Sequence, residues 1–287
     1  HLIYSGNFLA QVEKDQFGNI RAQLGMHPDT FCWKLSPGDT FETPQAVLNY
    51  SDKGLNGMRE NFHWLYQYHL IPGRFEKRMR PVLLNSWEAM YYDVTLEKIE
   101  KQADLAKQLG IELFVLDDGW FRSGNDSRSS MGDWVCNEKK LPGGINTAAD
   151  LIRGKGLQFG LWFEPEAVSE NSDLYRKHPG WALQIPGYQA VKGRHEFLLD
   201  LSIKEVRDYL FDKLSFYLDD GKVDYVKWDM NRPLTDVNSF MLAREEKGEI
   251  SHRYVLGLYE LLERITKKYP EVLIEGCASG GARFDPG

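Results

Sequence analysis

The alternation of short apolar runs with longer amphipathic segments is the sequence feature that most constrains the fold. Segments with helical spacing, such as 95–110, 202–221 and 252–269, separate the apolar runs. The six apolar runs cover residues 80–89, 111–120, 157–166, 196–202, 223–231 and 271–281. This order predicts six βα units, in which parallel strands are covered by helices. The sheet is then either doubly wound or closed into an eight-stranded barrel.

The residues at the carboxyl ends of these runs favour the barrel. Every run turns polar or aromatic where it ends, as at Asp117 and Asp118 or at Lys227 and Asp229. A barrel collects all of its strand ends around one mouth, whereas a doubly wound sheet brings only the ends near its switch point to one ligand. No glycine-rich phosphate motif follows the first run. We therefore expect an α/β fold, a (β/α)8 TIM barrel, with six units in this chain and two more needed for closure.

Three segments of different character divide the chain. Residues 1–53 alternate in polarity and are punctuated by turns, which predicts the C-terminal part of an N-terminal antiparallel β-sandwich. Residues 54–79 have apolar positions at helical spacing and are expected to form a helical linker. Residues 80–287 carry the βα units and are expected to form the incomplete barrel domain.

Composition and charge exclude several classes of function. The formal net charge is −7 and no basic stripe runs along the chain, so we expect neither nucleic acid nor a membrane as a partner. Cys32, Cys136 and Cys277 fit neither a disulfide framework nor a paired zinc site, and we interpret them as free thiols. No strand end carries a histidine cluster, so we expect no metal and no other cofactor. The compartment that we expect is the cytoplasm.

The decapeptide VDYVKWDMNR, residues 223–232, concentrates the chemistry. Period-two geometry sends Lys227, Asp229 and Asn231 to one face of the strand end. A structural Lys–Asp ion pair and a functional site explain this stretch equally well. Tryptophans and carboxylates around one mouth suit a neutral polyhydroxylated ligand, because indole faces cover the C–H face of a sugar and acids bind its hydroxyls. Phosphosugar chemistry stays open, since its phosphate site would follow later strands.

Four motifs, in order at the ends of successive runs, resemble the α-galactosidases of glycoside hydrolase family 36. They are LDDGW (116–120), GLWFEPE (160–166), KWDMNR (227–232) and CASGGARFDPG (277–287). The resemblance implies a retaining α-galactosidase that hydrolyses melibiose- or raffinose-type oligosaccharides by double displacement, and a homo-oligomer, a tetramer, when full length. A galactosyl transferase of the same architecture, such as a raffinose-family synthase, and a non-catalytic galactose-binding remnant are the alternatives.

The resemblance also implies roles for individual residues. Asp229 corresponds to the catalytic nucleophile, with Lys227 and Asn231 keeping it ionised and binding neighbouring hydroxyls. We expect the partner of Asp118 to be a ligand hydroxyl and not a protein group. The remaining sugar contacts are Trp87 and Trp162 as aromatic walls, Asp117 and Asp118 for the O4 and O6 hydroxyls, Arg194 for ring hydroxyls, and Cys277 and Gly280 on the 2-OH side. An inert core thiol is the alternative role for Cys277.

The general acid/base is expected beyond Gly287. By resemblance it lies shortly after the glycine-rich motif, so Asp285 is expected to be structural. Glu164 and Glu166 form a rival pair of carboxylates, which we interpret as scaffold. Retaining hydrolysis needs two carboxyl groups, so we expect residues 1–287 alone to be inactive.

Overall fold

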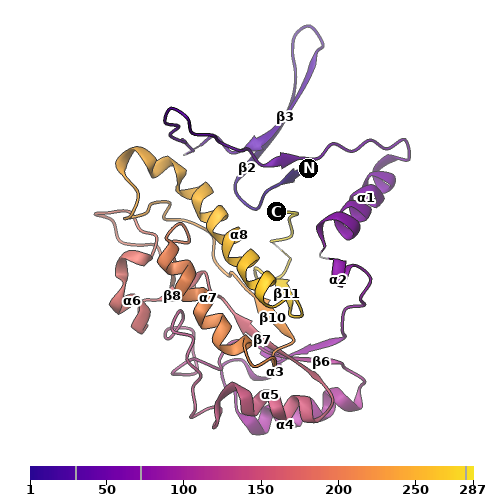
Figure 1. The fold of residues 1–287 in the computed structure, drawn as a ribbon, viewed down its shortest axis with the longest axis vertical. Coiled ribbons are helices and arrows are strands. Elements are labelled where there is room, and N and C mark those ends of the chain that lie inside the picture. Colours follow the sequence, from indigo (N-terminus) through magenta and orange to yellow (C-terminus); the bar gives the residue numbers. More distant parts are fainter. Residues whose placement is uncertain (30, 72, 282) are drawn as a thin grey trace. The chain divides into compact units, whose positions relative to one another are not determined.

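The computed structural model describes residues 1–29, 31–71, 73–281 and 283–287, which form two compact units. The N-terminal unit comprises His1–Arg80 together with Phe284–Gly287, and the sheet unit comprises Pro81–Arg283 (Figure 1). Each unit is considered by itself.

The N-terminal unit consists of two small antiparallel sheets and a helical segment. Strand β2 pairs with β3, and β1 pairs with β4. The bounds of its elements are β1 Leu2–Ile3, β2 Phe8–Lys14, β3 Ile20–Met26, β4 Gln45–Ala46, α1 Gly54–Leu65, the π-helical turn Tyr66–Leu70, and α2 Gly73–Glu76. Asp285 belongs to this unit, where it accepts hydrogen bonds from Ser5 Oγ at 2.7 Å and from Gly287 N at 2.8 Å.

A five-stranded parallel sheet forms the centre of the sheet unit. The strand order β5-β6-β7-β10-β11 follows the chain without reversal. Their bounds are β5 Leu83–Asn85, β6 Leu113–Leu116, β7 Gln158–Phe163, β10 Tyr225–Trp228 and β11 Leu273–Gly276. A doubly wound sheet reverses its strand order at a switch point. The unbroken order is therefore that of part of a barrel.

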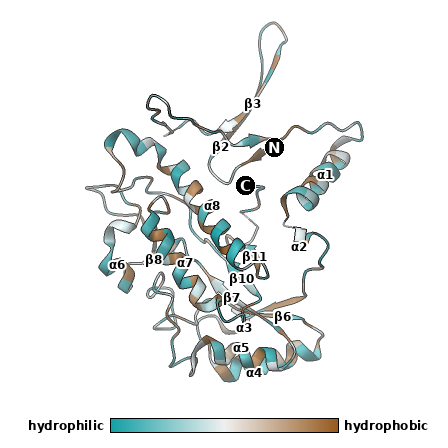
Figure 2. Ribbon diagram, in the orientation of Figure 1, coloured by the Kyte–Doolittle hydropathy of each residue, from teal (hydrophilic) through white to brown (hydrophobic). Residues whose placement is uncertain are grey.

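The helices that join these strands cover one face of the sheet. They are α4 Leu96–Gln108, α5 Gly144–Gly154, α7 Lys204–Leu218 and α8 Ile250–Lys268. Right-handed crossovers between successive neighbouring strands place all their helices on the same side. Helix α4 packs beside α5 and α7 beside α8 (Figure 1), and polar and apolar residues alternate along each helix (Figure 2). Thr95 caps α4, because its side chain accepts a hydrogen bond from Lys98 N at 3.3 Å.

The prediction of a barrel strand in 196–202 is wrong. Strand β9, Glu196–Leu198, pairs antiparallel with β8, Ala167–Ser169, and β7 pairs directly with β10. The short helix α6, Asp173–Lys177, is the one α-helix described between β7 and β9. A parallel crossover needs a dozen or more residues and usually a full helix. The described residues therefore contain five parallel strands of the expected barrel, not six, and 167–203 is an excursion from the carboxyl end of β7.

The two faces of the sheet bury different sets of side chains. The face turned away from the helices carries a small cluster of the buried residues Leu113, Val115 and Tyr225, against which the partly buried Leu273 packs. Gly160 lies in the same row of the sheet, and a Cβ there would approach Val115 Cγ2 to 3.0 Å and Tyr225 Cβ to 3.2 Å. The alternate residues, including Phe114, Leu161 and Val226, belong to the main core against the helices. Period-two alternation thus separates a helix-facing core from the inner face of the sheet.

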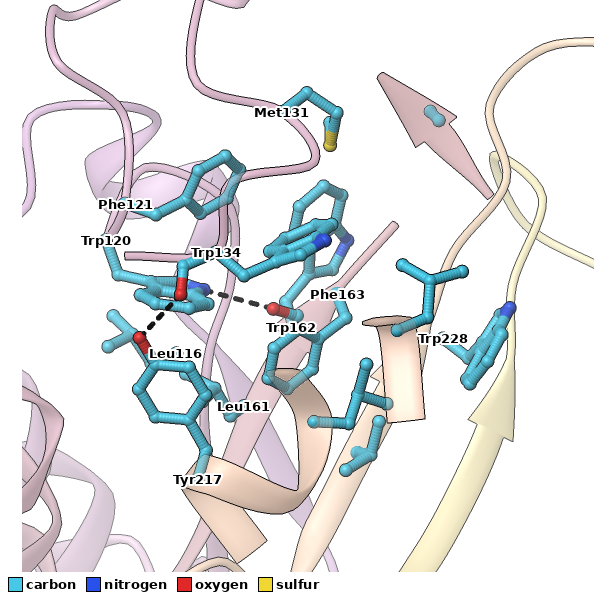
Figure 3. Close-up of a cluster of buried hydrophobic side chains, with 14 of the residues drawn as sticks. Leu116, Trp120, Phe121, Met131, Trp134, Leu161, Trp162, Phe163, Tyr217 and Trp228 are labelled. Carbon is cyan, nitrogen blue, oxygen red and sulfur yellow. Dashed lines mark hydrogen bonds between the residues drawn. The ribbon is translucent and has the colours of Figure 1, made fainter. Parts of the chain in front are cut away.

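An aromatic cluster of the main core lies at the carboxyl ends of β6 and β7 (Figure 3). The indole nitrogen of Trp120 donates to the carbonyl of Trp162 at 3.0 Å, and the hydroxyl of Tyr217 donates to the carbonyl of Trp134 at 2.8 Å. Trp120, Trp134 and Trp228 are all buried and pack in the core. In the part of the chain that the structure describes, no helix has both the length and the apolar character required to cross a membrane.

Candidate active site

A cavity of about 340 Å³ brings together all ten residues that the sequence predicts for the site. It lies at the carboxyl ends of the parallel strands, where barrel enzymes bind their ligands. Its lining is Trp87, Asp117, Asp118, Trp162, Arg194, Lys227, Asp229, Asn231, Cys277 and Gly280, together with Glu88 and Ser279.

The register of the sheet explains this convergence. Val115, Gly160 and Tyr225 align across β6, β7 and β10 on the inner face. Two residues further along each strand, the same face carries Asp117, Trp162 and Lys227, and Lys227 is directly paired with Trp162. Because side chains alternate along a strand, these three residues point to the same side as the inner cluster. Asp229 and Asn231 continue that row beyond the end of β10.

Asp229 is a buried carboxylate surrounded by hydrogen-bond donors. Its Oδ2 accepts from Trp162 Nε1 at 3.2 Å and from Asn231 Nδ2 at 2.7 Å, and its Oδ1 accepts from the backbone of Met230 at 2.9 Å. Burial alone would raise the pKa of this carboxyl, but hydrogen bonds from Asn231, Cys277 and Trp162 and the charge of Lys227 lower it below its usual value. Asp229 is therefore held ionised at neutral pH.

Lys227 forms its ion pair with Asp117, directly after β6, and not with Asp229. Its Nζ lies 2.7 Å from Asp117 Oδ2, and both side chains are largely buried. Asn85 Nδ2 donates to the same oxygen at 2.6 Å. Burial would lower the pKa of Lys227, but Asp117 raises it, so the ammonium is retained. The ion pair joins non-adjacent strands of the sheet and leaves Asp229 to its neutral donors.

The two consecutive aspartates both reach the cavity because the strand ends before them. Strand β6 stops at Leu116, and Gly119 has φ +113°. A Cβ at Gly119 would lie 3.0–3.2 Å from Val94 Cγ2 and from backbone atoms of Tyr91 and Tyr92. Only glycine is free of strain at this φ and this close approach. The turn after Leu116 allows Asp117 and Asp118 to point to the same cavity.

The expectation that Asp118 has no protein partner is wrong. Arg122 binds it with two hydrogen bonds, from Nε to Oδ1 at 2.9 Å and from a terminal nitrogen to Oδ2 at 2.8 Å. Both side chains are almost completely buried. Arg122 also donates to the carbonyl of Ser129 at 2.9 Å, which ties the pair to the following loop. A carboxylate has about four lone-pair sites, so Asp118 can still accept from a ligand at the cavity.

Glu196 lies behind Asp118 and shares its arginine. Glu196 Oε1 is 3.5 Å from Arg122, and no described residue hydrogen-bonds its buried Oε2. Burial and the neighbouring Glu164 raise the pKa of Glu196 to about 8, against the opposing charges of Arg122 and Arg194. Burial therefore favours the protonated form of Glu196, and the close ion pair of Arg122 is with Asp118.

The Glu196→Gln variant of the full-length protein is expected to be more stable than the wild type at about pH 8 and little changed at about pH 5. In the unfolded chain a Glu releases its proton near 4.5, whereas folded Glu196 keeps it to about 8. The contribution of Glu196 to the stability of the folded protein is complete below pH 4.5 and is lost as the pH rises through about 8. Gln does not titrate, so the variant lacks this loss. Melting temperatures of both proteins across this range measure it, and parallel pH dependences would contradict the prediction.

The remaining predicted residues form the walls and rim. The backbone nitrogen of Trp87 donates to Asn85 Oδ1 at 2.8 Å, which links this indole to the amide that binds Asp117. Arg194 is exposed in the loop before β9, with φ +52°. Cys277 is buried at the cavity, so both of its expected roles agree with its position. Gly280 has φ +117° beside it.

Sequence reasoning missed Arg122 and Ser279. Arg122 follows Asp118 by four residues in an irregular loop, where no periodicity indicates which side chains meet. Ser279 lines the cavity, and its hydroxyl donates to Asn231 Oδ1 at 2.6 Å. Ser279 lies between the predicted site residues Cys277 and Gly280 in the sequence, and this position could have indicated that it lines the cavity. Glu88, on the short helix α3, Trp87–Met90, also lines the cavity and accepts a hydrogen bond from Tyr91 at 2.9 Å.

Within the described ranges, no group of three or more His, Cys, Asp or Glu side chains could hold a metal ion.

This fold and this cavity define the class of protein. At the carboxyl ends of its strands, this part of a parallel barrel presents buried carboxylates, two indoles and a lysine. This set of side chains is suited to binding a neutral sugar. Residues 40–287 match the melibiase family model, and residues 1–36 match the model of the glycosyl hydrolase family 36 N-terminal domain. The chain belongs to the melibiase family of glycosyl hydrolase family 36, which confirms the resemblance carried by the four motifs.

Several relatives are similar over the whole chain. Alpha-galactosidase AgaA of Geobacillus stearothermophilus is 50% identical over 99% of this chain, and alpha-galactosidase Mel36A of Lactobacillus acidophilus is 46% identical over 100% of it. The match spans only 39% of either relative. The crystal structure of AgaA has a TM-score of 0.97 and that of a Lactobacillus brevis α-galactosidase has 0.98, each covering 100% of this chain and about two fifths of the other chain (40% and 39%).

Proposed function

We propose that the whole protein is a retaining α-galactosidase, which hydrolyses terminal α-galactosyl residues of melibiose- and raffinose-type oligosaccharides. The environment of Asp229 carries this proposal. A carboxylate that is buried at a sugar-sized cavity, and yet held ionised by three hydrogen-bonding side chains, is suited to attack an anomeric carbon. The α-galactosidase names of the relatives support the same activity.

Catalysis proceeds by two displacements at the anomeric carbon. An oxygen of Asp229 forms a bond to that carbon while the bond to the leaving-group oxygen breaks, which gives a covalent galactosyl-enzyme. Water then attacks the same carbon and releases Asp229. Asp117 and Asp118 accept from the O4 and O6 hydroxyls, and a glucose epimer would leave a buried acceptor unpaired at a cost of about 1–3 kcal/mol. Trp87 and Trp162 cover the apolar face of the sugar.

The proton donor is a second carboxyl group outside residues 1–287. Retaining enzymes place it about 5–5.5 Å from the nucleophile. Among the other carboxylates that line the cavity, Asp117 is paired with Lys227, Asp118 is paired with Arg122, and Glu88 accepts a hydrogen bond from Tyr91. In the whole protein, further strands close the five-stranded sheet into an eight-stranded barrel, and the N-terminal strands are the end of a β-sandwich. Residues 1–287 alone would then bind sugar without hydrolysing unactivated substrates.

Oligosaccharide substrates are supported by the relatives. Variants of AgaA have been crystallised in complex with stachyose and with raffinose. We extend this ligand class to the present protein, whose cavity carries the same family's motifs. The proposed assembly of the whole protein is a homotetramer, and its proposed compartment is the cytoplasm.

Anomeric analysis of the full-length protein tests the proposal. Proton NMR during hydrolysis of an aryl α-galactoside is expected to show α-galactose as the first product, because two displacements retain configuration. β-Galactose as the first product would contradict it. Incubation of melibiose with sucrose separates the transferase, since preferred transfer to sucrose over water would replace the hydrolase assignment. Galactose binding without any turnover would identify a binding remnant.

A further inference from the structure

We propose that Glu164 is a positioning residue for the nucleophile, which holds Asn231 so that its amide stays on Asp229. The inference rests on the proposed function and deepens it. Glu164 directly follows β7, is buried, and is absent from the lining of the cavity. It therefore acts on the reaction through another residue.

The hydrogen bonds around Asn231 leave its amide no freedom. Glu164 Oε1 accepts from the backbone nitrogen of Asn231, and Glu164 Oε2 accepts from its Nδ2 at 3.0 Å. The same Nδ2 donates to Asp229 Oδ2 at 2.7 Å, while Ser279 donates to Asn231 Oδ1 at 2.6 Å. An amide nitrogen has two hydrogens, so one serves Glu164 and the other serves Asp229. The carboxylate thus fixes both the backbone and the side chain of Asn231.

The register of β7 and β10 makes this contact short. Phe163 pairs with Trp228, and the backbone nitrogen of Asp229 donates to the carbonyl of Phe163 at 2.8 Å. Glu164 follows Phe163 directly after β7, so its side chain starts beside the nucleophile. Two parallel strands thereby bring a second carboxylate next to Asp229, with the Asn231 amide hydrogen-bonded to both.

Only an ionised carboxylate satisfies Asn231 with both oxygens. A Gln side chain, or a protonated Glu, would turn one donor toward a donor of Asn231 and lose one of the two hydrogen bonds. The titratable and charged groups around Glu164 are Asp229 just after β10, Arg194 in the loop before β9, and Glu196 on β9. Burial and the charge of Asp229 raise the pKa of Glu164 to about 7, although hydrogen bonds from Asn231 and the charge of Arg194 oppose the shift.

The test compares Glu164→Gln with Glu166→Gln in the full-length protein. Glu166 is a matched control, because it is also a buried carboxylate two residues along the chain. It accepts from Trp228 Nε1 at 2.9 Å and from Tyr254 at 2.6 Å, and neither residue lines the cavity. We expect Glu164→Gln to lower kcat for an aryl α-galactoside roughly tenfold or more, because a hydrogen bond to a charged group is lost. Glu166→Gln should lower the melting temperature more than kcat.

A double-mutant cycle with Asn231→Ala separates positioning from stability. If Glu164 acts through Asn231, the double variant loses no more activity than Asn231→Ala alone, whereas independent effects would multiply. The wild-type kcat/KM should rise through about pH 7 as Glu164 ionises, and this rise should be absent from Glu164→Gln. Glu164→Asp keeps the charge and serves in the cycle if the Gln variant does not fold.

The outcomes distinguish this inference from the proposed function. Wild-type kcat in Glu164→Gln, multiplying effects in the cycle, or an activity loss that only follows the melting temperature would overturn the positioning role. The α-galactosidase assignment would survive each of these results. A full-length wild-type protein without any turnover of α-galactosides would instead overturn the proposed function, on which the inference rests.

Discussion

Replacement of Asp229 by Gly in the full-length protein is expected to lower kcat for an aryl α-galactoside by roughly 10⁴-fold, because the covalent step loses its nucleophile. Azide should restore part of the rate, since it can enter the space that the side chain leaves. Azide would attack from the side on which Asp229 stood and give a β-galactosyl azide. Product analysis by NMR therefore identifies the face of attack as well as the loss of rate.

Asp224→Asn is the control for this experiment. Asp224 precedes β10, so it lies at the opposite end of the strand from Asp229. Its carboxylate accepts from the backbone nitrogen of Phe159 at 2.9 Å and pairs with Arg153, outside the cavity. We expect this variant to keep nearly wild-type kcat. An Asp229→Gly protein that retained a tenth of the wild-type rate without azide would show that another group is the nucleophile.

The composition of the cavity was largely predictable from the sequence. Strand runs that end in Asp117, Trp162 and Lys227 place these side chains on one face by simple alternation, provided that the strands are parallel neighbours. The family resemblance then added Trp87, Arg194 and the 277–280 loop, for which periodicity gives no information. All ten residues line one cavity, although their roles stay predictions until the variants are measured.

The strand count was not predictable in the same way. The run at 196–202 is apolar and ends in Asp200, and so it has the same local pattern as the true barrel strands. Its partner is β8, which follows β7 after a short turn, and an antiparallel pair of three residues leaves no periodic signal. Strand pairing is a non-local property, because it depends on which segments the intervening chain can bring together. The sequence between residues 167 and 195 lacks the pattern of a long helix, and this could have indicated that 196–202 is not a parallel strand of the barrel.

The polar contacts behind the cavity were also hidden. Arg122 binds Asp118 and lies near Glu196, and Glu164 binds Asn231. These contacts involve loops and strand ends, where backbone turns decide the direction of each side chain. The sequence indicates that a buried carboxylate needs a partner but not which residue supplies it. The ion pair of Lys227 is an example, since its partner Asp117 lies at the end of another strand, β6, and not near its own strand.

Replacement of Arg122 by Met is expected to destabilise the full-length protein by about 3–5 kcal/mol, because it leaves Asp118 buried without its counter-charge. Met has a similar length and no charge, so the loss measures the ion pair and the hydrogen bonds to the loop carbonyl of Ser129. Arg176→Met is the matched control. Arg176 pairs with Asp173 at the surface, with side chains 56% and 69% exposed, and exposed pairs contribute about 0–1 kcal/mol.

The double variant Arg122→Met with Asp118→Asn identifies the cause of the loss. Removing the negative charge of Asp118 should recover part of the stability that Arg122→Met alone loses, because the unpaired charge is then gone. The free energy of unfolding, measured by chemical denaturation for the four proteins of this cycle, gives the coupling. Strictly additive losses would mean that Arg122 stabilises the loop through its carbonyl contacts and not through Asp118. A strong coupling would show that the residue expected to meet only the sugar is held in place by a buried arginine.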